Sequence, residues 1–434
     1  MAPTARHRLP IELIESVIEA VDSHEDLLSF ALTCSYLYNH IQQSGYLQYR
    51  ELIVSAGHIH LWNHLIENPA HAAQVRVLTI YDIWYQGHIH RTSFRVPSDV
   101  SRNTASEWLD ARERLVACLP LFTGLGAITI FSRKGAYPAE DDLQATLCRQ
   151  WNSSIRSLTV RVMDQFPLDM DSLIWYIRDL RELDLSLPST LGANITLGTE
   201  VWPRFCAMLA LNPRLEVLRI PPFRGDAPPR TPLPHLPHLR TLHIAEQDAS
   251  TAIQLAFYAA AHPLITEFSW DTTLDVAITN APNLPRLERL IDTSPAFVNA
   301  MLSGRTSASV RLTKLGRFEL TADTLPVLRA VSASSLRALT LSSVDSHRTL
   351  AALATMFPDI KELHMPMRLD NDNGWISRIM RSPGITLEEA LRLFPRLCIV
   401  SGVMHVLPQS AARVKARGAY PCLRRVNGTR VDEL

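Results

Sequence analysis

Leu215-Glu216-Val217-Leu218-Arg219-Ile220 and Leu239-Arg240-Thr241-Leu242-His243-Ile244 are two copies of one short pattern, with apolar residues at the first, fourth and sixth positions. Full or partial copies also begin at Val75, Leu125, Ile155, Leu180, Ile265, Leu287, Leu315, Leu336, Ile360, Leu397 and Leu423. The fourth residues of these thirteen copies run from Leu78 to Val426, so the mean step is about 29 residues. A pattern this regular over most of the chain indicates a structural repeat.

Each copy predicts a short strand, because its fourth and sixth residues lie on the same face of an extended chain and can turn inward together. Helix-like stretches lie between copies, at 201–211, 251–261, 324–331 and 349–357. The alternation resembles the leucine-rich repeat family. The resemblance implies an irregular α/β solenoid over residues 73–434, in which parallel strands line a concave face and helices lie outside.

The residues that flank the inward-facing strand positions are expected to point out of the concave face, where such a solenoid binds its partner. They are polar, and they tend to be acidic in the middle of the chain. The sequence therefore predicts a target-binding surface that reads a basic or hydroxyl-rich protein segment, although an ordinary solvated sheet face is the alternative. The predicted target-binding residues are Glu182, Asp184, Arg219, His243, Glu267 and Asp271.

The first fifty residues differ from the repeats. Apolar residues at 10, 13, 14, 17, 18 and 21 are spaced by three and four, which predicts an amphipathic helix. Pro10 suits the first turn of that helix, and a second apolar stretch follows from Leu27 to Ile41. A helical segment this short buries little surface by itself, so it is expected to pack on a partner or on the rest of the chain.

The same segment resembles the F-box family. The matching motifs are Leu9-Pro10-Ile11-Glu12-Leu13-Ile14, Val17-Ile18, Asp26-Leu27-Leu28 and Thr33-Cys34-Ser35-Tyr36-Leu37-Tyr38. The resemblance implies docking onto the Skp adaptor of a cullin–RING ubiquitin ligase. The residues expected to supply the apolar docking surface are Leu9, Pro10, Leu13, Ile14, Val17, Ile18, Leu28 and Leu32.

Three domains are therefore expected: an F-box at 1–45, a helical connector at 46–72 and the repeat solenoid at 73–434. Two long segments, Tyr81–Gly124 and Ser186–Pro213, interrupt the rhythm of the repeats. The first is interpreted as a loop, with a functional insertion as the alternative.

Composition and charge exclude several classes of function. Lys plus Arg and Asp plus Glu both number 43, and this zero net charge argues against a nucleic-acid partner. No apolar run approaches the roughly 20 residues that span a bilayer, so no membrane association is expected. The six cysteines are scattered and form no CxxC pair, which is typical of reduced thiols in a cytoplasmic or nuclear protein.

The sequence contains no motif for phosphate binding, nucleophilic hydrolysis or zinc proteolysis, so no catalytic residue, cofactor or metal is predicted. His60 and His64 are four apart on a predicted helix, but nothing nearby completes a metal site. The expected function is that of a non-enzymatic substrate receptor, in which the F-box binds the adaptor and the repeats bind a target protein. The alternatives are a scaffold that does not direct ubiquitin transfer and an enzyme with a dispersed site.

Overall fold

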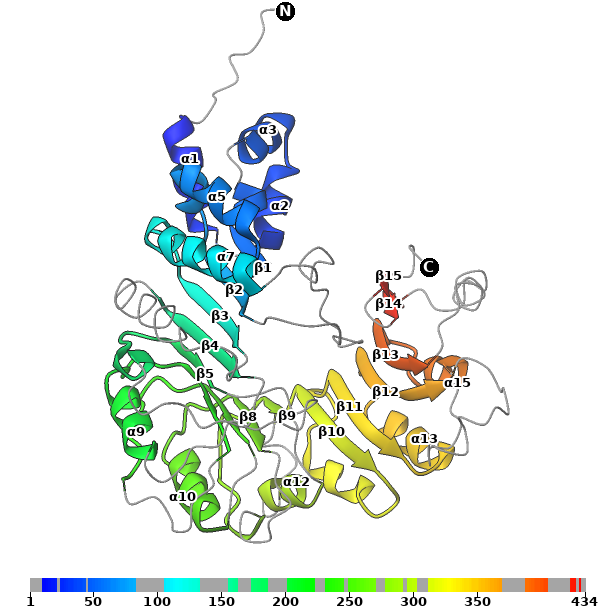
Figure 1. Cartoon of the computed structure of the whole chain (residues 1–434). Helices are drawn as coiled ribbons and strands as arrows, with labels where there is room; N and C mark the ends of the chain where they lie inside the picture. Colours follow the sequence, from blue (N-terminus) through cyan, green and yellow to red (C-terminus); the bar gives the residue numbers. More distant parts are fainter. Residues whose placement is uncertain are drawn as a thin grey trace, which may run out of the picture. The chain divides into compact units, whose positions relative to one another are not determined.

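The computed structural model describes residues 10–21, 24–43, 46–82, 105–132, 155–162, 173–185, 201–222, 231–245, 249–270, 278–291, 295–302, 311–368, 387–404, 422–426 and 429–430. The chain divides into two compact units, Met1–Ile195 and Thr196–Leu434. The fold is α/β, and each unit combines a parallel sheet with helices in a solenoid-like arrangement (Figure 1).

The first unit begins with helices and continues with strands that pair in chain order. Its strands are β1 (Glu51–Ser55), β2 (Val77–Asp82), β3 (Ala127–Ser132), β4 (Ser157–Val162) and β5 (Glu182–Asp184). Each is parallel to the next, and their register places Leu52, Leu78, Ile128, Leu158 and Leu183 in one buried line. The helical elements are α1 (Ile11–Ala20), α2 (His24–Ala31), α3 (Ser35–Gln43), α4 (Tyr46–Tyr49), α5 (Ile59–Glu67), α6 (Pro69–Ala72), α7 (Ala105–Cys118) and the 3-10 turns η2 (Leu119–Leu121) and η3 (Leu173–Tyr176).

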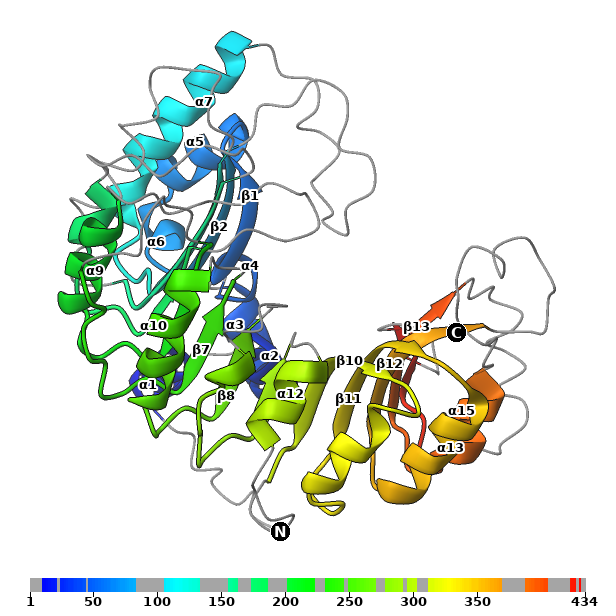
Figure 2. The ribbon, with the colours of Figure 1, turned by 90° about the horizontal axis from the view of Figure 1, so that it is seen from below.

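The second unit repeats one strand and one helical connection many times. Its strands are β6 (Val217–Ile220), β7 (Thr241–Ile244), β8 (Glu267–Trp270), β9 (Arg289–Ile291), β10 (Lys314–Leu320), β11 (Ala338–Val344), β12 (Glu362–Arg368), β13 (Ile399–Met404), β14 (Arg425–Val426) and β15 (Thr429–Arg430). Strands β6 to β14 are parallel, and β15 turns back antiparallel to β14. The helices α9 (Trp202–Ala210), α10 (Ala249–Ala260), α12 (Pro295–Leu302), α13 (His347–Met356) and α15 (Leu387–Leu393), with the 3-10 helix η5 (Leu325–Ala330), lie along one side of these strands (Figure 2).

A recurrent turn leads into each strand. Proline follows the helices α9, α10, α13 and α15 because it cannot continue a helix. The chain then closes a tight turn, as where the Leu215 amide donates to the carbonyl of Asn212 at 3.1 Å and the Ile265 amide to that of His262 at 3.2 Å. The buried Leu or Ile of this turn is the first apolar residue of the sequence pattern, so the pattern specifies the turn as well as the strand.

The core of each repeat lies between its strand and its helix. On β8, Phe268 and Trp270 are fully buried, and both pack against Phe297 of α12 with ring centroids 6.1 and 5.4 Å apart. The residues between the buried strand positions lie on the other face of the sheet, as Arg219 and His243 do in a half-buried setting. The alternation predicted from the sequence therefore separates a packed face from a polar face.

Every copy of the pattern coincides with a strand, which confirms the predicted strands, but the predicted connector at 46–72 is not purely helical. It contains β1, which pairs with β2 and starts the sheet before residue 73. β1 belongs to a further copy of the pattern, whose first, fourth and sixth residues are Tyr49, Leu52 and Val54, all buried. The first residue of this copy is a tyrosine, whereas it is aliphatic in the other copies. The compact-unit boundary at 195–196 also falls inside the predicted solenoid.

Two further expectations need correction. The interval Tyr81–Gly124 was interpreted as a loop, but its second half forms α7, with Trp108 and Leu115 buried, while residues 83–104 lie outside the described part. In β10 the first buried residue of the turn is Leu312 and not Leu315, because Leu315 pairs with Leu290 and Leu339. None of the described helices is long and apolar enough to cross a membrane.

Candidate interaction surfaces

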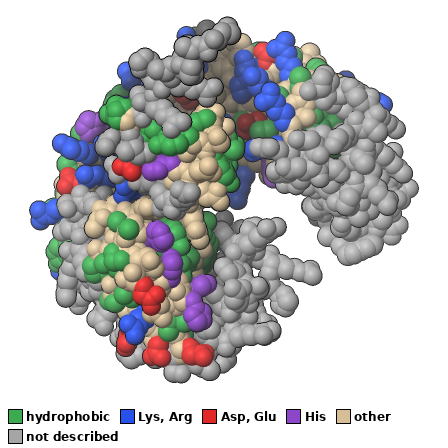
Figure 3. Space-filling model, turned by 90° about the horizontal axis from the view of Figure 1, so that it is seen from above, with side chains coloured by type: hydrophobic (Ala, Val, Ile, Leu, Met, Phe, Trp, Pro, Cys, Tyr) green, Lys and Arg blue, Asp and Glu red, His purple; other side chains and the backbone are tan. Residues whose placement is uncertain are grey.

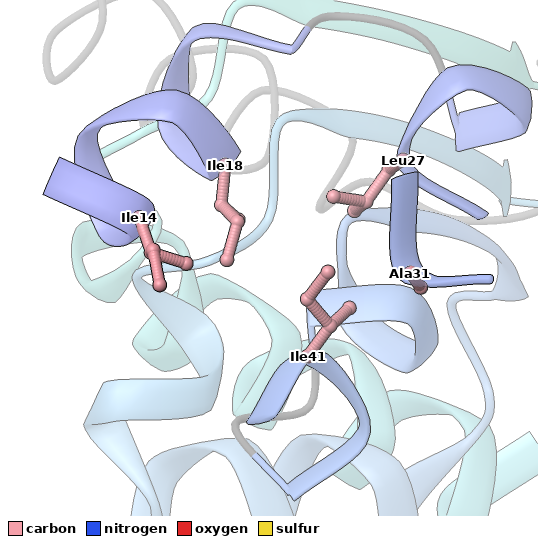
Figure 4. Close-up of a cluster of buried hydrophobic side chains, with 5 residues drawn as sticks. All are labelled: Ile14, Ile18, Leu27, Ala31 and Ile41. Carbon is pink, nitrogen blue, oxygen red and sulfur yellow. The ribbon is translucent and has the colours of Figure 1, made fainter. Parts of the chain in front are cut away.

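The helices α1, α2 and α3 have a small core of their own. Ile14 and Ile18 of α1, Leu27 and Ala31 of α2, and Ile41 of α3 are buried against one another (Figure 4). Spacings of four along α1 and α2 place each pair on one side of its helix, as the sequence predicts. The inner faces of the three helices therefore pack against one another in this core.

The outer faces carry large apolar side chains that are open to solvent. Leu13 and Val17 of α1 are 53% and 44% exposed, and Leu28 and Leu32 of α2 and the turn after it are 41% and 67% exposed. On α3, Tyr36 and Tyr38 are also exposed. We call these six residues the exposed apolar set. They account for six of the nine exposed large hydrophobic side chains in the described part of the chain, so such residues are concentrated in this short segment.

The eight residues predicted to dock the adaptor differ in their exposure to solvent. Leu13, Val17, Leu28 and Leu32 belong to the exposed apolar set, and Pro10 is exposed at the start of α1. Ile14 and Ile18 were wrongly included, because they are buried in the internal core and offer no surface to a partner. Leu9 lies outside the described residues.

Arg50 links this helical segment to the first strand, and sequence reasoning missed it. Its Nη1 donates to the carbonyl of Ile18 at 2.9 Å, in the last turn of α1, where a cation also complements the helix dipole. Its own carbonyl accepts the amides of Arg76 and Val77, which lead into β2. An isolated arginine between two apolar stretches carries no recognisable sequence signal, so only the fold reveals this link.

The residues predicted to form an acidic target-binding surface differ in their burial and in their ion pairs. In the first unit, Glu182 is exposed and accepts a hydrogen bond from Ser157 Oγ at 2.9 Å, whereas Asp184 is only 8% exposed. In the second unit, Glu267 Oε2 is 2.6 Å from Arg289 Nη1, and its Oε1 is 3.2 Å from His243 Nε2.

The surface is therefore less acidic than the sequence predicts, because Glu267 of β8 forms an ion pair with Arg289 of β9. Arg219, His243 and Glu267 do lie on the neighbouring strands β6, β7 and β8, as predicted. Asp271 lies outside the described residues.

The histidines in and around α5 make local contacts. His64 Nε2 is 2.9 Å from Tyr49 Oη and 3.4 Å from His71 Nδ1, and His58 caps α5 by accepting the Leu61 amide at 3.3 Å. Across the described ranges, no three His, Cys, Asp or Glu side chains come together as metal ligands. Burial raises the pKa of the Cys118 and Cys206 thiols to about 12, which keeps both thiols protonated and weakly nucleophilic.

No protein-family model matches the chain, and no curated protein matches it.

Proposed function

We propose that the chain is the substrate-recognition subunit of a Skp–cullin–F-box ubiquitin ligase, with α1–α3 as an F-box that binds the Skp adaptor and the repeats as a leucine-rich solenoid that binds a target protein. The exposed apolar set is the observation that carries the proposal. Helices α1–α3 already have an internal core, yet they present six large apolar side chains to water. An exposed apolar group concentrated in one segment is typical of a protein-binding surface.

The repeats support the second half of the proposal. Parallel strands with helices on one side leave the other sheet face open to a partner, and such surfaces suit extended protein segments. In this arrangement the chain supplies proximity and orientation, while ubiquitin transfer is catalysed by other subunits. A scaffold that binds the adaptor without recruiting a cullin is the second candidate, and it rests on the same exposed apolar set.

The adaptor half is tested by pull-down with a Skp adaptor. The variant Leu28→Asp/Leu32→Asp places two charges in the exposed apolar set without touching the internal core, so it should fold and lose at least about 90% of the captured adaptor, as expected for central hot-spot residues. The matched control is Phe257→Asp on α10, which changes an apolar side chain that is 66% exposed in the other unit. Equal capture by the variant and the control would refute the F-box assignment.

The same pull-down separates the ligase from the scaffold. Cullin should be captured together with adaptor by the parent chain and lost with adaptor in the Leu28→Asp/Leu32→Asp variant. Adaptor captured reproducibly without cullin, from an extract in which the adaptor itself binds cullin, would favour the scaffold.

A further inference from the structure

The turns before the strands align equivalent side chains into rows. In each turn, one carbonyl accepts two successive amides of the next turn: Glu288 accepts from Thr313 and Lys314, and Thr313 accepts from Arg337 and Ala338. The ladder continues through Arg337, Lys361 and Cys398 to Arg424 and Arg425. Neighbouring strands lie about 4.8 Å apart, so residues at the same place in successive turns stand side by side.

We define the strand-start rim as three positions in each of the six turns that lead into β9–β14. They are the residue before the buried residue of the turn, such as Arg286 before Leu287, and the two residues after it, such as Glu288 and Arg289. The rim consists of Arg286, Glu288, Arg289, Arg311, Thr313, Lys314, Ser335, Arg337, Ala338, Asp359, Lys361, Glu362, Arg396, Cys398, Ile399, Cys422, Arg424 and Arg425.

The strand-start rim is strongly basic in a chain whose net charge is zero. Nine of its eighteen residues are Lys or Arg and three are Asp or Glu. The corresponding nine positions before β6–β8 hold two basic and two acidic residues, so the excess does not extend to these three strands. On the face of the molecule drawn in Figure 3, Lys and Arg side chains gather in a group (blue, towards the upper right).

Ion pairs within the protein neutralise only part of this charge. Asp359 pairs with Arg337 at 3.5 Å and also with Arg396, and Arg289 pairs with Glu267 of β8. Within the part of the chain that the structure describes, Arg286, Arg311 and Lys361 are exposed and form no ion pair. These three cations lie in three of four successive turns and remain available to an external anion.

We propose that the strand-start rim of β9–β14 binds an acidic, extended segment of the target protein. This inference rests on the proposed function, and it reverses the charge of the target segment that the sequence predicts. Six strands about 4.8 Å apart span about 24 Å, which an extended peptide of about eight residues matches. Opposite charges along such a row raise the rate of capture and set the register of the bound segment.

The composition of the rim favours a protein segment over a nucleic acid. Surfaces that bind single strands interleave aromatic side chains with cations so that bases can stack. The eighteen rim positions contain no Phe, Tyr or Trp. Three acidic residues also interrupt the row of cations. They would repel the continuous negative charge of a phosphate backbone. A peptide can instead place neutral residues opposite them.

The experiment measures binding of a fluorescein-labelled peptide of about ten residues, alternating Glu and Ser, to the full chain by fluorescence anisotropy at two salt concentrations. The rim variant is Arg286→Glu/Arg311→Glu/Lys361→Glu. The matched control is Arg204→Glu/Arg329→Glu/Arg348→Glu, which changes the net charge equally at exposed positions on α9, η5 and α13. The rim variant should bind the peptide roughly tenfold more weakly at low salt, because each exposed charge contributes only a modest part of the binding free energy. The control should bind like the parent.

Equal affinities of the rim variant and the control for the peptide would overturn the inference. So would parent binding to a Gln-Ser peptide as tight as to the Glu-Ser peptide, or tighter binding to an oligothymidine of the same length. The assay contains no adaptor, so a negative result here leaves the adaptor pull-down to be judged by itself. A failed pull-down would likewise leave the peptide result intact.

Discussion

At the scale of single residues, buried polar groups show how the repeats are held together. His262, in the turn after α10, is 2% exposed and both of its ring nitrogens are used. Nε2 accepts the Leu236 amide of the preceding turn at 3.0 Å, so Nδ1 carries the proton and donates it to the Tyr258 carbonyl at 2.6 Å. The neutral ring therefore bridges two successive repeats.

The first prediction concerns this histidine and pH. Burial lowers the pKa of His262 below its ordinary value of 6.5; the hydrogen bond to the Tyr258 carbonyl opposes this shift in part, and the neighbouring His235 adds to it. The folded state then binds fewer protons than the unfolded state, so the stabilisation is complete above about pH 6.5 and is lost as pH falls below it. The free energy of unfolding should decrease between about pH 7 and 5 more steeply in the parent than in His262→Gln, as measured by urea denaturation. The exposed His238→Gln is the control and should follow the parent; identical slopes in all three would show that His262 does not contribute.

At the scale of elements, most strands could be predicted because each needs only two buried residues and a turn. β1 was missed because a tyrosine replaces the usual aliphatic residue, although Tyr49 fills the same buried position. β10 was misaligned because a bulge adds a residue between Leu315 and Phe318, and Arg317 there has a φ of 49°. A bulge makes two residues oppose one, which no periodic pattern reveals.

The candidate surfaces were less predictable than the strands, because sequence gives the face of a residue but not its partner. Glu267 was placed on the correct face, yet Arg289 on the next strand pairs with it. Ile14 and Leu13 are adjacent apolar residues of one helix, and only packing decides that the first is buried and the second exposed. The basic rim was missed because its residues are far apart in the chain and are aligned only by the repeated turn.

A second bulge gives the next prediction. β12 carries an extra residue between His364 and Met367, and opposite it Gly402 of β13 has a φ of 85°. A Cβ at Gly402 would lie 2.3 Å from the Met365 carbonyl oxygen, which is far inside contact distance. Gly402→Ala should therefore lower the free energy of unfolding by at least about 1–3 kcal/mol, measured by urea denaturation. The control is Gly126→Ala, where a Cβ would meet the Arg76 carbonyl at an ordinary 3.9 Å; equal stability of the two variants would contradict the geometry.

At the scale of the whole molecule, the two proposed functions occupy different compact units. The exposed apolar set lies between residues 13 and 38, and the strand-start rim lies between residues 286 and 425. In a repeat structure each turn packs mainly on its neighbours, so a surface change is expected to act mainly on the turns next to it in the chain. A receptor built this way can hold its adaptor and its target independently.

The last prediction follows from that separation. Sites that lie in different compact units and share no residues are expected to contribute additively, within about 0.5 kcal/mol. The rim variant Arg286→Glu/Arg311→Glu/Lys361→Glu should therefore capture as much adaptor as the parent, and Leu28→Asp/Leu32→Asp should bind the Glu-Ser peptide with parental affinity. The combined variant should show the two losses together and no additional one, as measured by adaptor pull-down and fluorescence anisotropy on the same preparations. The proposed adaptor site and the proposed peptide site lie in different compact units. A change in peptide affinity when saturating adaptor is added would therefore reveal a coupling between the units that independent docking excludes.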